Sequence, residues 1–299
     1  MQTAAQAAAV VWINGRIVAP DDAKVSVYDR SYLYGDSLYE VVRTYGGRFF
    51  GMKEHLARLN ASAHLCHLDI SQKDAEIVAA CEEALKAFQK KAGSPRAEAY
   101  CRLIVSRGEG KIGFGKNCLT TGSLLTIIVQ PLEAPSDEQR RVGIRLKLAE
   151  RIRLDRRALE PAIKSGNYLN CLLAYLEAVE ATKEDALLCD GEGFVSEGTT
   201  FNVFYVKRGI LVTPPLEIGI LEGITRKLVI DAARKNQIAV REIRFPRERL
   251  YEADEAFLTG TIKEILPIGE IEGRKIGSAQ RPVTDILWRE FKNATQVSS

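Results

Sequence analysis

A lysine and a glutamate that are 33 residues apart (197 − 164) limit the possible folds of this chain more than any other pair of residues. Lys164 precedes a Ser-Gly-Asn turn, and Glu197 lies where a strand-like run breaks into a glycine-containing turn. Between them, apolar residues recur at spacings of three and four, which predicts an amphipathic helix with its apolar face buried. These positions are Leu169, Leu172, Leu173, Leu176 and Val179. The following segment, LLCDGEGFVSEG, predicts a hairpin, so one helix and one hairpin can return Glu197 to the cleft of Lys164.

The chemistry of this pair indicates a cofactor that carries an aldehyde. A lysine amine has an ordinary pKa of about 10.4 and becomes an effective nucleophile when it is desolvated or held as an imine. Pyridoxal phosphate is the common biological aldehyde bound in this way, and a carboxylate keeps its pyridine nitrogen protonated. The alternative is that Lys164 is a solvated loop residue and Glu197 caps a turn. Further parts of a cofactor site decide between these interpretations.

Three segments could bind a phosphate group. Gly223 loosens a loop before a predicted helix that has Thr225 in its first turn, and free amides at a helix start bind anions. A buried strand ends in Thr259-Gly260-Thr261, which offers more amides and hydroxyls. Arg58, in KEHLARLNASA, could contact a phosphate with two hydrogen bonds. Together with Lys164 and Glu197, these residues complete the inventory of a pyridoxal phosphate pocket.

The order of these motifs resembles the class IV aminotransferases of pyridoxal phosphate fold type IV. The matching segments are YGDSLYEVVRTYGG, HLARLNASA, IKSGNYLN, VSEGTTFNVF, TPP, GITR, ADEAFLTGT and PVT. The resemblance extends from about Val11 to about Phe291 and implies a two-domain α+β fold. The family contains branched-chain and D-amino-acid aminotransferases and aminodeoxychorismate lyase.

The resemblance also implies a role for each site residue. Lys164 would bind pyridoxal 5'-phosphate covalently and later move the proton at the substrate carbon, which is general acid–base catalysis. Glu197 would pair with the pyridinium, and Tyr168 would hydrogen-bond the ring hydroxyl. The phosphate would be held by Arg58, Ile224, Thr225 and Thr261.

Two strand segments carry the residues expected to select the substrate. Tyr34, Tyr39 and Arg43 match the family pattern YG-x-x-x-[FY]-E-x-x-[RK], and alternation along a strand puts Tyr39 and Arg43 on one face. Tyr100 and Arg102 share another strand face and resemble the Tyr-x-Arg of branched-chain enzymes. In those enzymes the tyrosine contacts the substrate carboxylate, and the arginine holds the side-chain carboxylate of glutamate. A solvated strand face with Arg102 paired to an acid is the structural alternative.

The leading hypothesis is transamination of L-branched-chain or related amino acids with 2-oxoglutarate. The D-amino-acid enzymes match almost as well, but they carry an Arg-x-His in the loop that here has the sequence RGEGKIGFG. Ile262 and Lys263 follow Thr261 where branched-chain enzymes carry two small residues, and Ile262 could narrow the substrate site. Aminodeoxychorismate lyase activity and a non-catalytic cofactor-binding protein remain as alternatives.

The 299 residues are enough for two domains. Alternating strand-like and helical segments predict an N-terminal α+β domain over 1–130. QPLEAPSDEQR, with two prolines and a charge run, indicates a linker over 131–141, and a C-terminal cofactor-binding domain is expected over 142–299. GEGKIG, at 108–113, matches a nucleotide-binding pattern but is followed by a turn and a strand instead of a helix. We therefore expect a mobile glycine-rich loop over the active site.

Charge and cysteine content limit the partners. A net charge of +3, from 42 basic and 39 acidic residues, gives no case for nucleic acid or an acidic membrane surface. No apolar run approaches the roughly 18 residues of a membrane span. Six cysteines without a CxxC pair indicate reduced thiols in a cytoplasmic protein.

His64 and His67 lack the further ligands of a metal site, so no metal is expected. The expected partners are small amino acids and 2-oxo acids, and the resemblance implies a homodimer or a higher homo-oligomer.

Overall fold

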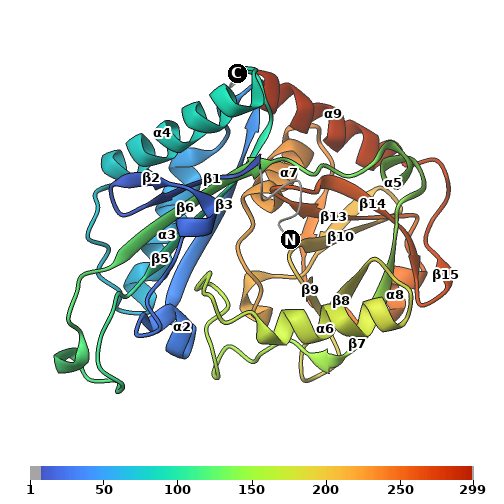
Figure 1. Ribbon diagram of the computed structural model, residues 1–299. Coiled ribbons are helices and arrows are strands. Elements are labelled where there is room, and N and C mark those ends of the chain that lie inside the picture. The colour runs from blue at the N-terminus through green and yellow to red at the C-terminus, as the bar shows by residue number, and fades with distance from the viewer. Residues whose placement is uncertain (1–7, 298–299) are drawn as a thin grey trace. The chain divides into compact units, whose positions relative to one another are not determined.

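The structure is a computed structural model that describes residues 8–297 (Figure 1). Its contacts divide the chain into two compact units. The described part of the first unit comprises 8–133 and 163–167, and the second comprises 134–162 and 168–297. Both units combine helices with sheets, so the predicted α+β class is confirmed.

The first unit is built on a six-stranded antiparallel sheet with the order β2-β1-β6-β5-β3-β4. Its hairpins turn at Asn14-Gly15 and Gly46-Gly47, where all four residues have positive φ, as the Asn-Gly and Gly-Gly pairs predict. The strands are β1 (Val10–Ile13), β2 (Arg16–Val18), β3 (Ser37–Tyr45), β4 (Arg48–Phe49), β5 (Ala99–Ser106) and β6 (Leu124–Pro131).

Two helices, α3 (Met52–Leu65) and α4 (Asp74–Ala92), cover one face of this sheet (Figure 1). Alternation along β5 puts Ala99, Cys101 and Leu103 into the core beneath them, while Tyr100 and Arg102 lie on the opposite face. The unit also contains the short helix α2 (Arg30–Tyr34) and the 3-10 turns η1 (Pro20–Asp22) and η2 (Lys116–Cys118).

The segment 163–167 lies along β3 of the first unit. The amide of Tyr39 donates to the carbonyl of Lys164 (3.0 Å), and the amide of Gly166 donates to the carbonyl of Ser37 (2.8 Å). The sequence analysis assigned Lys164 to the C-terminal domain because the residues around it belong there. Main-chain pairing with β3 instead places it with the first unit.

The second unit contains a nine-stranded mixed sheet with the order β12-β11-β10-β13-β14-β7-β8-β9, and β15 pairs with β14. The hairpin predicted before Glu197 is confirmed, because β8 and β9 pair antiparallel. The strands are β7 (Ile144–Ile152), β8 (Asp185–Cys189), β9 (Val195–Gly198), β10 (Asn202–Lys207), β11 (Ile210–Thr213), β12 (Val240–Glu242), β13 (Glu255–Gly260), β14 (Glu264–Ile271) and β15 (Arg274–Lys275). The helical elements are α5 (Asp137–Val142), α6 (Leu169–Glu180), η3 (Leu216–Ile218), α7 (Ile224–Lys235), α8 (Glu248–Tyr251) and α9 (Pro282–Val297).

The helix predicted after Tyr168 exists as α6, but the prediction of its buried face was wrong. Its small residues Cys171, Ala174 and Ala178 are buried, and Ala174 and Ala178 pack with Ala186 and Leu188 of β8. The larger residues Leu169, Leu172, Leu176 and Val179 are exposed, and Leu173 is half-buried. Periodicity alone does not show which of two apolar faces meets the sheet.

We expect Ala174→Leu to destabilise the protein, because Ala174 is fully buried against the sheet. Extra methylene groups in a packed site typically cost about 1–3 kcal/mol. Denaturant unfolding measures the change, and Glu180→Leu on the exposed side of α6 is the matched control. Equal stability of A174L and E180L would contradict the orientation of α6.

Candidate active site

In the first unit, the structure brings two of the predicted residues, Lys164 and Arg102, to the ring of a third, Tyr39. The Lys164 amine donates to the Tyr39 hydroxyl (3.0 Å), and its Nζ atom lies 4.2 Å from the ring centroid. The Arg102 guanidinium carbon lies 4.1 Å from the same centroid. Both cations can therefore interact with the π face of Tyr39. The arrangement sets a primary amine beside a cation suited to a carboxylate.

The other predicted strand residues lie on the same face of this sheet. In the register of β3 and β5, Tyr39 pairs with Ile104, Val41 with Arg102, and Arg43 with Tyr100. Directly opposed residues on neighbouring strands share a sheet face, so the two predicted pairs, Tyr39 with Arg43 and Tyr100 with Arg102, lie on one common face, which the sequence did not predict. Arg43 is buried, and its guanidinium lies 4.2 Å from the Tyr45 ring centroid.

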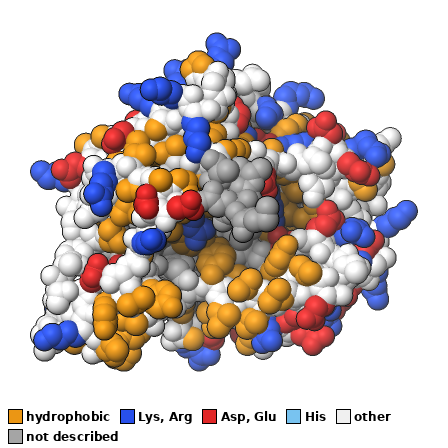
Figure 2. Space-filling model, viewed as in Figure 1, with side chains coloured by type: hydrophobic (Ala, Val, Ile, Leu, Met, Phe, Trp, Pro, Cys, Tyr) orange, Lys and Arg blue, Asp and Glu red, His pale blue; other side chains and the backbone are white. Residues whose placement is uncertain are grey.

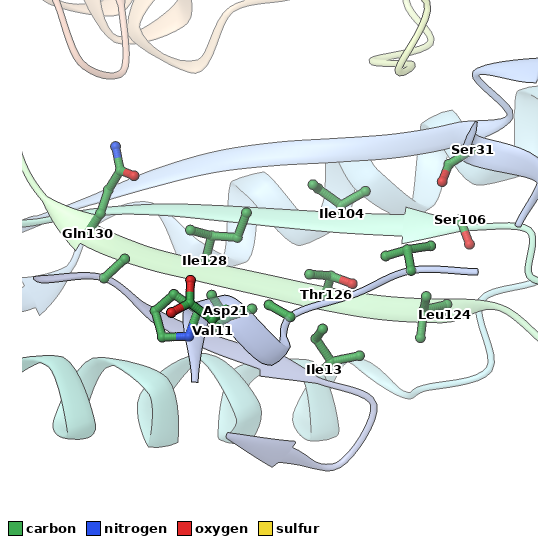
Figure 3. Close-up of a pocket in the computed structure, with 14 residues that line it drawn as sticks. Val11, Ile13, Asp21, Ser31, Ile104, Ser106, Leu124, Thr126, Ile128 and Gln130 are labelled. Carbon is green, nitrogen blue, oxygen red and sulfur yellow. The ribbon is translucent and has the colours of Figure 1, made fainter. Parts of the chain in front are cut away.

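A cavity of about 530 Å³ adjoins this face (Figure 3). Ile104, which pairs with Tyr39, is part of its lining, together with Thr126 and Ile128 of β6. In Figure 3 these side chains point from the two strands into the cavity, and Ser31 and Ser106 lie toward one end. The cavity is mainly apolar with a few hydroxyl groups, a composition typical of small-molecule sites.

Arg58 is held on the helix side of the first unit by a buried carboxylate. Glu40 of β3 accepts two hydrogen bonds from Arg58 (2.8 and 2.7 Å) and lies 2.7 Å from His55 Nδ1. Burial raises the pKa of Glu40, but the hydrogen bonds and charges of Arg58 and His55 together outweigh burial and lower the pKa from 4.5 to about 2. Burial lowers the pKa of His55 despite the carboxylate beside it. Glu40 therefore stays ionised and fixes the orientation of Arg58.

Tyr34 contacts the glycine-rich loop. Its hydroxyl accepts a hydrogen bond from the Gly113 amide (2.9 Å), and its ring lies 5.2 Å from that of Phe114. Arg30 donates to the Gly113 carbonyl (2.7 Å). Residues 108–113 lead through η2 to β6, so the match to a nucleotide-binding loop lacks the helix that such a loop requires.

In the second unit, Glu197 is surrounded by hydrogen-bond donors. Arg153 Nε donates to it (2.9 Å), as do the Leu221 amide (3.1 Å) and the Asn202 side chain (3.4 Å). Burial lowers the pKa of Arg153, but the charge and hydrogen bond of Glu197, with further contributions from Cys171 and from Tyr168 at the start of α6, together raise it above its ordinary value. Arg153 therefore lies close to both predicted ring contacts. Three donors therefore hold the Glu197 carboxylate in one orientation.

Asn202 links Glu197 to both predicted phosphate segments of the second unit. Its side chain donates to the Leu221 carbonyl (3.0 Å), just before α7, and its backbone pairs with Thr259, near the turn that contains Thr261 and Ile262. Gly223 is the N-cap of α7, and a Cβ atom there would lie 2.1 Å from the Asn202 side-chain oxygen. No side chain caps the helix, so the amides beside Ile224 and Thr225 are suited to an anion.

The sequence analysis missed Glu40, His55, Arg153 and Asn202. Glu40 carries a readable signal, because an acid between the core positions Leu38 and Val42 of an alternating strand needs a buried cation. His55 and Arg58 are three residues apart on α3 and share a helix face, which identifies the partners. Arg153 and Asn202 depend on long-range pairing that no local pattern shows.

Across residues 8–297, no group of three or more His, Cys, Asp or Glu side chains is arranged to hold a metal ion. Within the same range, no helix is both long enough and apolar enough to cross a membrane. All six cysteines are free thiols.

An anchored lysine, a buried carboxylate paired with an arginine and an uncapped helix start are the groups that a phosphorylated aldehyde cofactor requires. Comparison with known proteins agrees. Residues 37–271 match the family described as amino-transferase class IV, and the chain belongs to this family. It is 40% identical to a putative branched-chain-amino-acid aminotransferase of Methanocaldococcus jannaschii, with 95% of each chain covered. It is also 32% identical to D-alanine aminotransferase of Bacillus licheniformis, with coverage of 95% and 96%.

Solved structures give the same assignment and confirm the predicted fold type IV. The branched-chain amino acid aminotransferase of Escherichia coli superposes with a TM-score of 0.86 and 33% identity, covering 95% of this chain and 93% of that one. The branched-chain aminotransferase of the archaeon Thermoproteus uzoniensis, solved with norvaline, has a TM-score of 0.82 and 32% identity, with coverage of 96% and 95%.

We expect Glu40→Gln to lower the free energy of unfolding at pH 7 by about 3 kcal/mol, the equivalent of the pKa shift of Glu40. The folded-state pKa lies below the ordinary value of 4.5, so this stabilisation is present above pH 4.5 and is lost as the pH falls toward 2. Urea unfolding between pH 7 and pH 3 measures both effects. Glu54→Gln, exposed on α3, should leave the profile unchanged. A wild-type pH profile in E40Q would refute the role of Glu40.

Proposed function

We propose that the protein catalyses pyridoxal phosphate-dependent transamination of L-branched-chain or related amino acids with 2-oxoglutarate. The observation that carries this proposal is the contact of both Lys164 and Arg102 with Tyr39. It supplies an amine for the cofactor and a cation for the second carboxylate of glutamate. The relatives named as branched-chain aminotransferases, at 40% and 34% identity, support the same substrate class.

The residues present fit the cofactor. Bound pyridoxal phosphate would supply an electron sink for the bonds at the substrate α-carbon. Lys164 would bind its aldehyde, Glu197 its ring nitrogen and Tyr168 its ring hydroxyl. The phosphate would be held by Arg58, Ile224, Thr225 and Thr261. The uncapped start of α7 and the arginine that Glu40 orients support these roles.

Lys164 would also move the substrate proton. Its amine would take the proton from the substrate α-carbon as a general base and would then donate a proton as a general acid. The hydrogen bond to Tyr39 would hold the amine in position during both steps.

Substrate selection would depend on Tyr34, Tyr39, Arg43, Tyr100, Arg102 and Ile262. Tyr100 would contact the α-carboxylate, and Arg102 would bind the side-chain carboxylate of glutamate. Branched aliphatic side chains need an apolar surface, and Ile262 would narrow it. D-amino-acid transamination is the second candidate, because the D-alanine aminotransferase of B. licheniformis is 32% identical over nearly its whole length. Aminodeoxychorismate lyase activity is the third.

We also propose a cytoplasmic homodimer or higher homo-oligomer that acts on small amino acids and 2-oxo acids. The six free thiols are consistent with a reducing compartment. The near balance of 42 basic and 39 acidic residues favours small substrates over nucleic acid.

The first test is a single-turnover titration of the cofactor-loaded protein with L-leucine, L-glutamate, D-alanine and D-glutamate. We expect both L-amino acids to convert the visible absorbance of the cofactor rapidly. Conversion by D-amino acids alone would overturn the substrate assignment, and no conversion would favour the lyase. Borohydride should trap the cofactor on wild type and on Lys86→Ala, an exposed control, but not on Lys164→Ala. Trapping on K164A would refute the role of Lys164.

Arg102→Leu should raise the KM for 2-oxoglutarate by about 10- to 100-fold, because a hydrogen bond to a charged group contributes about 1.5–3 kcal/mol. The KM for a branched-chain 2-oxo acid should change little, since that substrate lacks the second carboxylate. Steady-state kinetics with both oxo acids measures the difference. Arg96→Leu, exposed in the same unit, is the control. Equal effects on both substrates would show that Arg102 only supports the sheet.

A further inference from the structure

The turn between β13 and β14 carries two charged residues directly after the predicted ligands Thr261 and Ile262. Strand pairing between Gly260 and Glu264 closes this turn. Lys263 and Glu264 each bind partners in other elements of the second unit. The turn is therefore attached to its surroundings by the side chains that follow the predicted ligands.

Glu264 has a backbone conformation that favours glycine. Its φ of 56° lies in the left-handed region, which is unfavourable for a residue with a Cβ atom. Hairpins with a three-residue turn usually place a glycine at their left-handed position, because glycine adopts it without steric cost. A glutamate at this position indicates that its side chain has a role that outweighs the backbone strain.

The Glu264 carboxylate is enclosed by cations from two helices that lie beside β14 in Figure 1. The side chain is 1% exposed, accepts a hydrogen bond from Arg140 of α5 (2.9 Å) and lies 3.6 Å from Lys292 of α9. Both cations also lie on the ring of Trp288, at 4.8 and 4.9 Å from its centroid. By contrast, the basic and acidic side chains visible in Figure 2 are spread over the surface. Removing Glu264 would leave its cations without their buried partner.

Lys263 attaches the turn to the segment that follows Glu197. Its amine binds Asp185, and the same carboxylate accepts a hydrogen bond from the Thr199 hydroxyl (2.5 Å). The amine also lies 4.6 Å from the ring centroid of Phe201. Thr199 and Phe201 come within four residues of Glu197, the predicted partner of the cofactor ring. The turn is therefore connected on one side to the ring segment and on the other to α5 and α9.

We propose that Glu264 is a positioning residue for the cofactor phosphate: its contacts with Arg140 and Lys292 hold the turn that presents Thr261 and Ile262. This inference rests on the proposed function, in which Thr261 binds the phosphate and Ile262 borders the substrate. Glu264 acts through the backbone of the turn, since its side chain is occupied by the two cations.

Binding of pyridoxamine 5'-phosphate to the cofactor-free protein tests the proposal, because this probe carries the phosphate but cannot form an imine with Lys164. We expect Glu264→Gln to raise its Kd by about tenfold, the loss expected when a hydrogen bond to a charged group is weakened. Glu264→Gly removes the backbone strain together with the carboxylate and should raise the Kd as much. Isothermal titration calorimetry measures both effects.

The matched control is Glu252→Gln, which removes an exposed acid that is paired with Arg249 in the same unit. We expect this variant to bind the probe as wild type does. Wild-type Kd values in both E264Q and E264G would overturn the proposal.

A double-mutant cycle tests the route through Arg140. Arg140→Gln should raise the Kd by a factor similar to that of E264Q, and the double variant should bind no more weakly than either single variant. The two residues act through one ion pair, so their effects should not add. Fully additive losses would contradict the role of this ion pair.

Phosphorus NMR of the bound probe gives a signature that a loss of stability alone would not produce. The resonance should shift in E264Q relative to wild type and E252Q, because the donors around the phosphate move. An unchanged resonance in E264Q saturated with the probe would contradict the positioning role.

Hydrogen exchange on the cofactor-free protein separates this inference from the proposed function. The amides of residues 259–266 should exchange faster in E264Q, whereas those of α6 should keep the wild-type rate. Faster exchange throughout the second unit would show that Glu264 only supports the fold. Failure of wild type to bind the probe would refute the proposed cofactor, whereas unchanged exchange in the turn of E264Q would refute the hold of Glu264 on that turn.

Discussion

Main-chain pairing between β3 and the segment 163–167 fixes the position of Lys164 in the first unit. The hydrogen bonds from the Tyr39 amide to the Lys164 carbonyl and from the Gly166 amide to the Ser37 carbonyl join two backbones. They therefore do not depend on side-chain conformation. The other edge of β3 pairs with β5, which carries Arg102 opposite Val41. Strand β3 therefore aligns the Lys164 amine, the Tyr39 phenol and the Arg102 guanidinium. Side chains positioned by strands are held more precisely than side chains on loops.

Three of the buried glutamates in the described residues are each paired with an arginine. Glu40 pairs with Arg58, Glu197 with Arg153, and Glu264 with Arg140. Burying both charges costs solvation, and removing one partner would leave the other charge buried and unpaired, so each pair constrains the geometry around it. In this chain the fixed partners are an arginine suited to a phosphate and a glutamate suited to a ring nitrogen.

Local sequence patterns predicted most of the elements and indicated candidate site residues, but they did not show the partners of those residues. The Asn-Gly and Gly-Gly turns and the alternation of Tyr39 with Arg43 depend on backbone chemistry within a few residues, so a sequence shows them directly. Arg153 meets Glu197 across 44 residues, a contact set by sheet order. The prediction of the buried side of α6 was wrong because the small and the large residues of this helix recur with the same period. The limited space between α6 and β8 accepts only the alanines, and the sequence does not show this.

After Thr261, Ile262 and Lys263 replace the two small residues that follow this threonine in branched-chain enzymes, and the structure shows what surrounds Lys263. Ile262 and Lys263 stand in the turn between β13 and β14, where Gly260 pairs with Glu264. The Lys263 amine binds Asp185, a buried acid that also accepts a hydrogen bond from Thr199, and it lies 4.6 Å from the Phe201 ring centroid. The charge of Lys263 is therefore neutralised by Asp185 within the second unit. We therefore propose that, of the two residues after Thr261, Ile262 contributes to substrate preference, because its side chain adds apolar volume without charge.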